Sequence, residues 1–250
     1  MITVSVIVPV YNKRDYLQQS IDHILAQDLP DKEVILVDDA STDGSGELCE
    51  KLYGGRTDVR IFHQIRNGGA GRARNIGIHV ARGQYVAFVD ADDIIQPGYL
   101  QRLYETAIQQ NADVVAESGP FVKEPTPFPE TFAERCHLIW TFRYYTSACY
   151  KVYRTSFLRE HYIEFHPFTF LEDVMFGIET FLCAGGVHNC QVSGMQWSRR
   201  RNPLRAATSL PGVRLTWIPS CGHAVNSMRC LLGCRRHRDR RKLVRVCSCA

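Results

Sequence analysis

The amino-acid sequence predicts an α/β protein in which helices cover both faces of a parallel, doubly wound sheet. Short apolar runs rich in β-branched residues recur along the first half of the chain and indicate buried strands. Between them lie segments with apolar residues three or four positions apart, the spacing of an amphipathic helix. Strands that alternate with such helices are typical of a parallel sheet. The composition, 45% hydrophobic and 22% charged among 250 residues, is that of a globular protein.

The elements follow in chain order, each from its own pattern. Residues 4–8 are apolar and β-branched without a basic leader, so they predict a buried strand rather than a signal peptide. The next helix presents one apolar face, made by Leu17, Ile21, Ile24 and Leu25. Pro97 suits the first turn of a helix that runs to about Gln110. The other expected strands are 33–37, 59–63, 85–89, one that starts at 114–115, and 187–192. The other expected helices are 45–52, 70–81 and 172–184.

The remaining segments lack this alternation. Residues 120–129 contain four prolines and predict a loop, and the aromatic stretch 140–153 predicts β structure. Residues 199–250 hold 13 Lys and Arg against one acid, whereas residues 1–198 hold 17 against 25 acids. Half of the 10 cysteines also lie in this basic tail, which we interpret as a frame-shifted or truncated end. No apolar run reaches the ~20 residues of a membrane span, so a cytoplasmic protein is expected.

An acidic pair follows the second predicted strand, at the edge where open α/β sheets bind ligands. Asp43 or Ser41 is explained by capping of the next helix. Two adjacent acids at Asp38 and Asp39 exceed what a cap requires. Asp39 is therefore predicted to accept hydrogen bonds from a ligand, such as a base N–H or a ribose hydroxyl.

A second acidic cluster, Asp90, Asp92 and Asp93, follows the strand at 85–89. Three carboxylates in four positions are costly unless a cation is present. Oxygen ligands suit Mg²⁺ or Mn²⁺, which commonly bridge protein carboxylates to the phosphates of a substrate. A helix cap ahead of Pro97 would explain Asp93 but not the other two.

Two further motifs lie at predicted helix starts. Glycines in the segment 67–75 would let backbone amides approach a phosphate, and Arg72 or Arg74 would add positive charge. For Arg72, a flexible turn with solvated arginines is an equally good explanation. The glycine spacing fits neither a dinucleotide-binding motif nor a P-loop. Glu172 and Asp173 open the helix 172–184, where the helix dipole by itself explains acidic residues.

Taken in order, these motifs resemble family 2 glycosyltransferases of the GT-A fold. The segments that carry the resemblance are 6–12, 38–45, 67–75, 90–93 and 172–173. It covers about residues 2–195 and implies a mixed, mostly parallel sheet, with a nucleotide-sugar-binding half at 1–117 and an acceptor-side half at 118–198. It also implies an inverting transferase that uses a nucleotide-diphosphate sugar, a UDP-sugar being favoured, together with Mn²⁺ or Mg²⁺.

The resemblance assigns roles to individual residues. Those that would hold the donor are Pro9, Tyr11, Asp39, Asn67, Arg74 and Asp90, and those that would ligate the metal are Asp92 and Asp90. Asp173 matches the family's catalytic base, which would take the proton of an acceptor hydroxyl as its oxygen attacks the anomeric carbon. The expected acceptor is a glycan or a lipid-linked glycan, in the synthesis of surface polysaccharide or lipopolysaccharide.

Other functions stay open at this point. An inactive nucleotide-sugar-binding protein would keep Asp39 and Asp92 in use, with Asp173 as a helix cap. A phosphatase of the haloacid dehalogenase type also uses D-x-D, but on its first strand, and a nucleotidyltransferase would carry a Gly-rich amino-terminal loop. The basic segment Arg235–Arg245 suits contact with an anionic membrane, or nonspecific but not specific binding of nucleic acid. The cysteine spacings in the tail fit no familiar zinc site.

Overall fold

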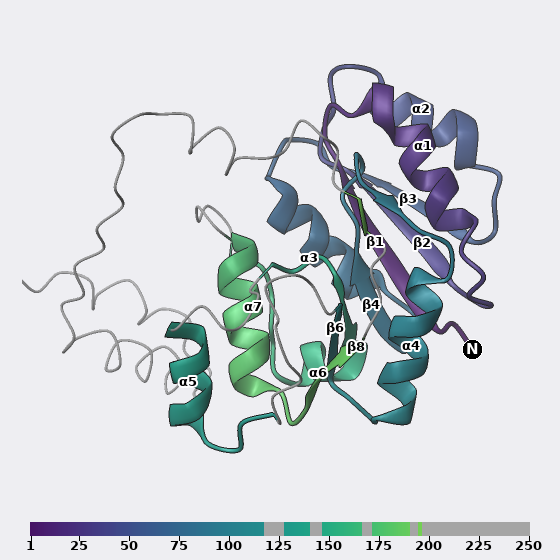
Figure 1. The fold of residues 1–250 in the computed structure, drawn as a ribbon. Coiled ribbons are helices and arrows are strands. Elements are labelled where there is room, and N and C mark those ends of the chain that lie inside the picture. Colours follow the sequence, from purple (N-terminus) through teal and green to yellow (C-terminus); the bar gives the residue numbers. More distant parts are fainter. Residues whose placement is uncertain (118–127, 141–146, 167–171, 191–194, 197–250) are drawn as a thin grey trace, which may run out of the picture. The chain divides into compact units, whose positions relative to one another are not determined.

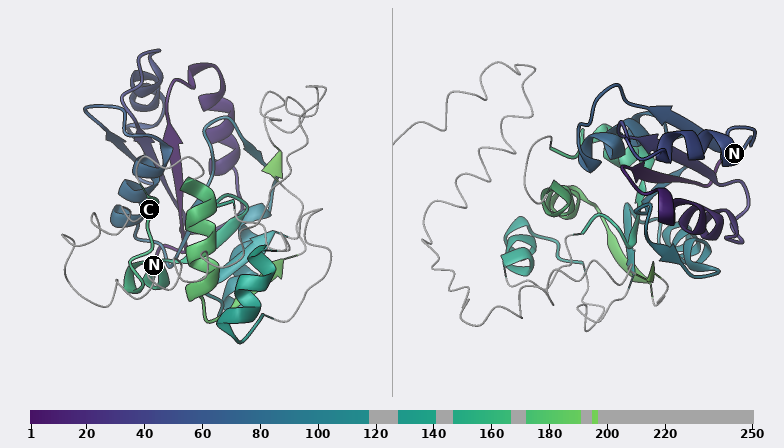
Figure 2. Two further views of the ribbon diagram at one scale, coloured as in Figure 1. Left: turned by 90° about the vertical axis from the view of Figure 1, so that its left-hand side faces the viewer. Right: turned by 90° about the horizontal axis from the view of Figure 1, so that it is seen from above.

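The structure, a computed structural model, describes residues 1–117, 128–140, 147–166, 172–190 and 195–196 (Figures 1 and 2). The chain divides into two compact units, Met1–Arg201 and Asn202–Ala250, and every described residue belongs to the first. The basic tail, most of the proline-rich loop and the end of the last predicted strand lie outside the described residues. Within the described part, no helix has both the length and the apolar character needed to cross a membrane.

Strands and helices alternate along the first 117 residues, as the sequence predicts. The strands of the described chain are β1 (Val4–Val10), β2 (Glu33–Asp38), β3 (Val59–His63), β4 (Tyr85–Phe88), β5 (Ile94–Ile95), β6 (Val114–Glu117), β7 (Lys151–Arg154), β8 (Val187–Cys190) and β9 (Met195–Gln196). The helices are α1 (Arg14–Leu25), α2 (Ser45–Tyr53), α3 (Ala70–Val80), α4 (Tyr99–Gln109), α5 (Phe132–Trp140), α6 (Thr155–Glu160) and α7 (Glu172–Cys183).

Seven of these strands form one sheet, in the order β3-β2-β1-β4-β7-β6-β8. β1 runs parallel to β2 and β4, β2 to β3, and β6 to β8. β7 is antiparallel to both of its neighbours, so the sheet is mixed and mostly parallel, as expected for a GT-A fold. The short strands β5 and β9 pair separately. The carboxyl ends of β1, β2 and β4 therefore meet at one edge of the sheet, and β7 begins at that same edge.

Each face of the sheet has its own apolar core. One face is covered by α1, α2 and α4, with Leu17 and Leu103 fully buried. The other is covered by α3, α6 and α7, with Ala73 and Phe176 fully buried. Burial of a side chain such as Leu or Phe stabilises the fold by ~1.5–3 kcal/mol. Packing on both faces therefore holds the carboxyl edge in a fixed geometry.

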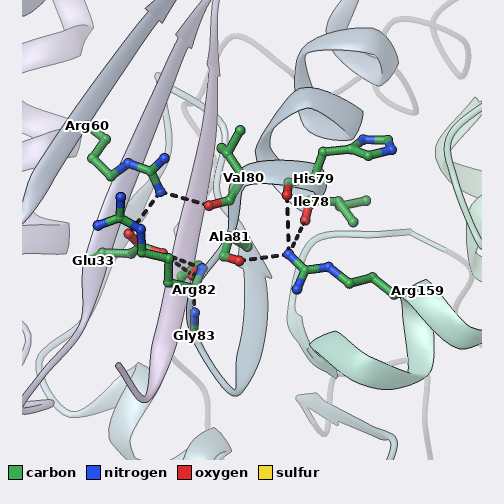
Figure 3. Close-up of polar contacts among 10 residues, drawn as sticks. Glu33, Arg60, Ile78, His79, Val80, Ala81, Arg82, Gly83 and Arg159 are labelled. Carbon is green, nitrogen blue, oxygen red and sulfur yellow. Dashed lines mark hydrogen bonds and ion pairs between the residues drawn. The ribbon is translucent and has the colours of Figure 1, made fainter. Parts of the chain in front are cut away.

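The carboxyl end of α3 is held by two arginines from neighbouring elements (Figure 3). Arg159 Nη2 donates to three carbonyl oxygens, those of Ile78, His79 and Ala81, at 3.0, 3.3 and 2.7 Å. Arg60 Nη1 donates to the carbonyl oxygen of Val80 at 2.7 Å. The last carbonyls of a helix have no partner within the helix, and positive charge complements its dipole there. These contacts fix α3, whose opposite end borders the site described below.

We expect Arg159→Leu to lower the free energy of unfolding by about 2 kcal/mol, because hydrogen bonds from a charged donor contribute ~1.5–3 kcal/mol. Urea unfolding followed by circular dichroism measures the change. Arg66→Leu, at an exposed arginine after β3, is the control and should change stability by less than about 0.5 kcal/mol. Equal losses in the two variants would contradict the capping role of Arg159.

Two sequence predictions need correction. In the described part of the aromatic stretch 140–153, which leaves out residues 141–146, α5 reaches Trp140 and β structure begins only at Lys151, with β7. The sequence analysis did not predict α5 and α6, which are only nine and six residues long and carry little periodicity. Pro97 does not open a helix either. The helix α4 begins at Tyr99, after Gly98 turns the chain with a φ of 72°.

Candidate functional site

A cleft of about 510 Å³ opens at the carboxyl edge of β1, β2 and β4. Its walls come from the ends of these strands and from the starts of α3 and α7. It is lined by Pro9, Val10, Tyr11, Lys13, Asp39, Asn67, Gly69, Ala70, Arg74, Asp90, Ala91, Asp92, Glu172 and Asp173. All eight residues named from the family resemblance are among them. The structure thus brings together groups from five separate segments of the chain.

Asp39 lies at the bottom of one side of the cleft and is only 2% exposed. Its Oδ1 accepts hydrogen bonds from Gly68 N at 2.8 Å and from Gln64 Nε2 at 2.6 Å, and its Oδ2 accepts one from Gly69 N at 2.7 Å. Gly69 has a φ of 85°, a conformation that favours glycine. Asp39 therefore holds the glycine loop at the start of α3 against the cleft. The sequence did not predict this role of Asp39, and the ligand contact that it did predict there stays a prediction.

The loop after β1 forms the rim on the same side. Tyr11 is 44% exposed, and Pro9 is half-buried behind it. The loop is tied to the segment after β2, because Asn12 N donates to Ser41 Oγ at 3.1 Å and Thr42 N donates to Asn12 Oδ1 at 2.8 Å. These contacts hold the loop that carries Tyr11 at the cleft, which Asp39 also lines. Ser41 thus braces this loop, whereas Asp43 Oδ1 accepts from Ser45 N, the first amide of α2.

Arg74 is a buried cation that joins the two sides of the cleft. It is 5% exposed, and its Nη2 donates to Asp90 Oδ1 at 2.8 Å. Its Nη1 lies 3.6 Å from Glu172 Oε1, and its guanidinium lies over the ring of Phe165. Burial alone would lower the pKa of Arg74, but Asp90, Cys149 and Glu172 together outweigh burial and raise it. Arg74 therefore links α3 to the end of β4 and the start of α7, and its contact with a phosphate stays a prediction.

Asp92 forms an ion pair that the sequence did not predict. Lys13 Nζ donates to Asp92 Oδ2 at 2.7 Å, and the Asp92 side chain is 5% exposed. Lys13 immediately precedes α1, where a positive charge is unfavourable to the helix dipole. This unfavourable position of a positive charge is the feature of the sequence that could have indicated a role for Lys13 outside the helix. In this structure the ammonium group supplies the positive charge that Asp92 requires.

The acidic residues of the cleft suit a divalent cation only in part. Asp90 and Asp92 both offer hard oxygen ligands, but Asp90 Oδ1 already accepts from Arg74. Among the described residues, no three His, Cys, Asp or Glu side chains form a group that could hold a metal ion. Mg²⁺ commonly binds through one or two carboxylates plus the phosphates of a substrate. The residues would therefore fit a metal whose coordination a bound diphosphate completes, and the role of Asp92 as its ligand stays a prediction.

Asp173 faces the cleft from the first turn of α7. Its Oδ1 accepts a hydrogen bond from Val174 N at 2.8 Å, which orients the carboxylate at the helix start. An aromatic cluster seats α7 on the sheet: Phe176 stacks on Phe165 with ring centroids 4.1 Å apart and meets Phe88 edge-on at 5.6 Å. Gly71 lets α3 approach α7, since a Cβ there would lie 3.1 Å from Glu172 Cγ. Packing rather than local sequence thus decides where Asp173 points.

A family model described as "Glycosyl transferase family 2" matches residues 5–186, most of the chain. The chain belongs to this family. The match argues against the phosphatase and nucleotidyltransferase alternatives, because the matched residues include both the amino-terminal strand and the acidic cluster at 90–93.

Curated relatives of this family 2 chain include glycosyltransferase GlyG of Streptococcus pneumoniae, 46% identical over 112 residues, which are 45% of this chain and 37% of GlyG. Poly(ribitol-phosphate) beta-N-acetylglucosaminyltransferase TarS of Staphylococcus aureus is 31% identical over 196 residues, 75% of this chain and 34% of TarS. The crystal structure of TarS 1-349 with UDP-GlcNAc has a TM-score of 0.67 and 26% identity, and the match covers 78% of this chain and 58% of that one. The chain spans about a third of the length of these two curated relatives.

Proposed function

We propose that this protein transfers a sugar from a nucleotide-diphosphate sugar to an acceptor hydroxyl, with inversion at the anomeric carbon. The observation that carries the proposal is the single cleft shared by Asp39, Asp92 and Asp173, three carboxylates from distant segments. Each has a different setting: Asp39 is hydrogen-bonded to backbone amides, Asp92 is paired with a cation, and Asp173 opens a helix. Such a transfer needs three kinds of group: one that binds the base, one near the phosphates and one that accepts the proton.

The donor would lie along the wall made by the ends of β1 and β2. Tyr11 offers an exposed ring on which a base can stack, with Pro9 beside it, and Asp39 offers a carboxylate to a base N–H. The loop at Asn67 would border the ribose and diphosphate. Support for a uridine nucleotide comes from TarS, whose structures contain UDP and UDP-GlcNAc.

The chemistry would take place between Asp92 and Asp173. Asp173 would accept the proton of the acceptor hydroxyl while that oxygen attacks the anomeric carbon from the face opposite the leaving diphosphate. One such displacement inverts the configuration. Mg²⁺ or Mn²⁺, held by Asp92 with Asp90 nearby, would neutralise charge on the leaving diphosphate. Arg74, through its contacts with Asp90 and Glu172, would hold Asp90 and the start of α7 in fixed positions relative to each other.

Release of nucleoside diphosphate from a panel of nucleotide sugars tests the proposal. We expect a UDP-sugar to give the fastest release, and to give more of it when surface glycans or lipid-linked glycans are added as acceptors. Calorimetric titration with UDP and Mn²⁺ is run in parallel. Binding without turnover of any donor would favour the alternative, an inactive nucleotide-sugar-binding protein.

We expect Asp92→Asn to weaken Mn²⁺-dependent binding of UDP at least tenfold, equivalent to ~1.4 kcal/mol, because a neutral amide is a poor ligand for a hard cation. Calorimetry with Mn²⁺ and with a chelator measures the difference. An affinity that is the same in both conditions for the native protein would remove the metal from the mechanism.

Lys13→Met is the contrasting change at the same ion pair. Because the ammonium of Lys13 occupies Asp92 Oδ2, its removal should take away a cation that competes with a metal for that oxygen. We expect the affinity for Mn²⁺ alone to rise by about fivefold, the equivalent of ~1 kcal/mol for a partly exposed pair. Paramagnetic resonance of free Mn²⁺ follows the titration. A lower affinity would mean that Lys13 supports the metal site instead of competing for it.

We also propose that the protein works in the cytoplasm, on a glycan or lipid-linked glycan of the cell surface, with contact to anionic lipid through residues 235–245. The support is the cluster of Lys and Arg in that segment, since each such charge near an anionic surface contributes ~1 kcal/mol. The full chain should sediment with phosphatidylglycerol vesicles but not with phosphatidylcholine vesicles. A variant that ends at residue 198 should stay in the supernatant with both, and equal sedimentation of the two proteins would contradict the proposal.

A further inference from the structure

Lys151, the first residue of β7, is buried at the edge of the sheet that carries the cleft. Its residue surface is 2% exposed, and its Nζ donates to the carbonyl oxygen of Ser147 at 2.6 Å. Lysine is among the residues least often fully buried, because an ammonium group loses its hydration there. The mechanism above assigns this buried cation no role.

The strand pairing locates Lys151 with respect to the site. β7 is antiparallel to β4, with Tyr153 opposite Val86 and Val152 opposite Ala87. The first residue of β7 therefore lies at the end of β4 from which the acidic segment 90–93 continues. Side chains alternate along a strand, so Lys151 shares its face of the sheet with Tyr153. That face is the one covered by α7.

The packing of α7 places Asp173 over the same position. Phe176 meets the ring of Tyr153 with centroids 5.3 Å apart. Asp173 precedes Phe176 by three residues, so it lies about one turn nearer the cleft on the same face of the helix. Lys151 precedes Tyr153 by two residues in the same direction along the strand. Asp173 and Lys151 therefore both lie at the cleft end of this face of the sheet.

The charges around Lys151 agree with this placement. Burial lowers the pKa of Lys151 to about 7, and the groups that act against burial to keep its proton are Cys149 and Asp173. The charged lysine thus interacts favourably with the carboxylate proposed as the base. Because burial disfavours its charge, Lys151 adds little to the stability of the fold at neutral pH.

We propose that Lys151 is a positioning residue that acts from below the cleft on Asp173 and keeps its carboxylate aimed at the acceptor hydroxyl. This inference rests on the proposed role of Asp173. The attraction of a buried cation on this face of the sheet and the hydrogen bond from the amide of Val174 would together restrict the carboxylate. Such restriction matters for turnover rather than for donor binding, because a misplaced base slows proton transfer without changing the contacts of the nucleotide.

The test compares Lys151→Met with a matched control, Lys32→Met. Lys32 also donates through Nζ to a backbone carbonyl, that of Gln27 at 2.9 Å, and its pKa is also lowered by burial, but it lies outside the cleft. Release of nucleoside diphosphate is measured with the most active nucleotide sugar of the panel, and affinity with UDP and Mn²⁺. We expect Lys151→Met to lower kcat about tenfold with KM and UDP affinity within about twofold, and Lys32→Met to change neither.

A double-mutant cycle with Asp173→Asn separates positioning from a structural role. If Lys151 acts through Asp173, Lys151→Met should cause no further loss once Asp173 is Asn. An equal fold-loss in both backgrounds, or full turnover of Lys151→Met alone, would overturn the inference. If Lys151→Met does not fold, Lys151→Gln takes its place in the cycle, and failure of both to fold would show a structural role and overturn it as well. Full turnover of Asp173→Asn by itself would instead overturn the proposed function.

Discussion

Asp173→Asn is expected to leave UDP affinity within about twofold of the native value and to lower turnover by ~10² or more, the usual scale for loss of a general base. Asn keeps the shape of the side chain and its hydrogen bond to Val174 N, but its amide cannot accept the acceptor's proton. Steady-state release of nucleoside diphosphate and calorimetry with UDP measure the two quantities separately.

Glu172→Gln is the control for Asp173→Asn. The two acids are adjacent on α7, so they point about 100° apart, and Glu172 is turned toward Arg74. We expect Glu172→Gln to cost less than the change at Asp173. A larger loss at Glu172, or a native rate in Asp173→Asn, would assign the base to another group.

The second large effect is expected on stability, at Arg74. Arg74→Met should lower the free energy of unfolding by about 3 kcal/mol, because it removes the buried cation that pairs with the carboxylate of Asp90. Arg74→Lys keeps the charge but not the two-pronged reach to Asp90 and Glu172, so an intermediate loss is expected. Urea unfolding measures both variants.

An exposed ion pair of the same length provides the control for Arg74. Arg56 Nη2 lies 2.8 Å from Asp58 Oδ2, the distance between Arg74 Nη2 and Asp90 Oδ1, but the two side chains are 47% and 36% exposed. Solvent screens such a pair, so Arg56→Met should cost less than about 1 kcal/mol. Similar losses at Arg56 and Arg74 would mean that burial of Arg74 contributes nothing to the strength of its pair.

Local pattern was sufficient for most of the first 117 residues. The structure contains all four strands predicted in this part, 4–8, 33–37, 59–63 and 85–89. A continuous run of β-branched residues between two segments with helical spacing is compatible with few structures other than a buried strand. The second half was harder to predict. There β7 is only four residues long and antiparallel, and its direction depends on which strands it meets across the sheet.

The sequence by itself determined the class of the fold and where its polar groups would gather. Acids directly after parallel strands must meet at one edge, whatever the details of packing, and Asp39, Asp90 and Asp92 do so. Only the tertiary structure decided what each group contacts. Lys13 and Asp92 are 79 positions apart, and the pairing of β7 and the seating of α7 bring Lys151 and Asp173 to the same face of the sheet. Such contacts depend on register and on helix packing, which long-range interactions set and which no local spacing encodes.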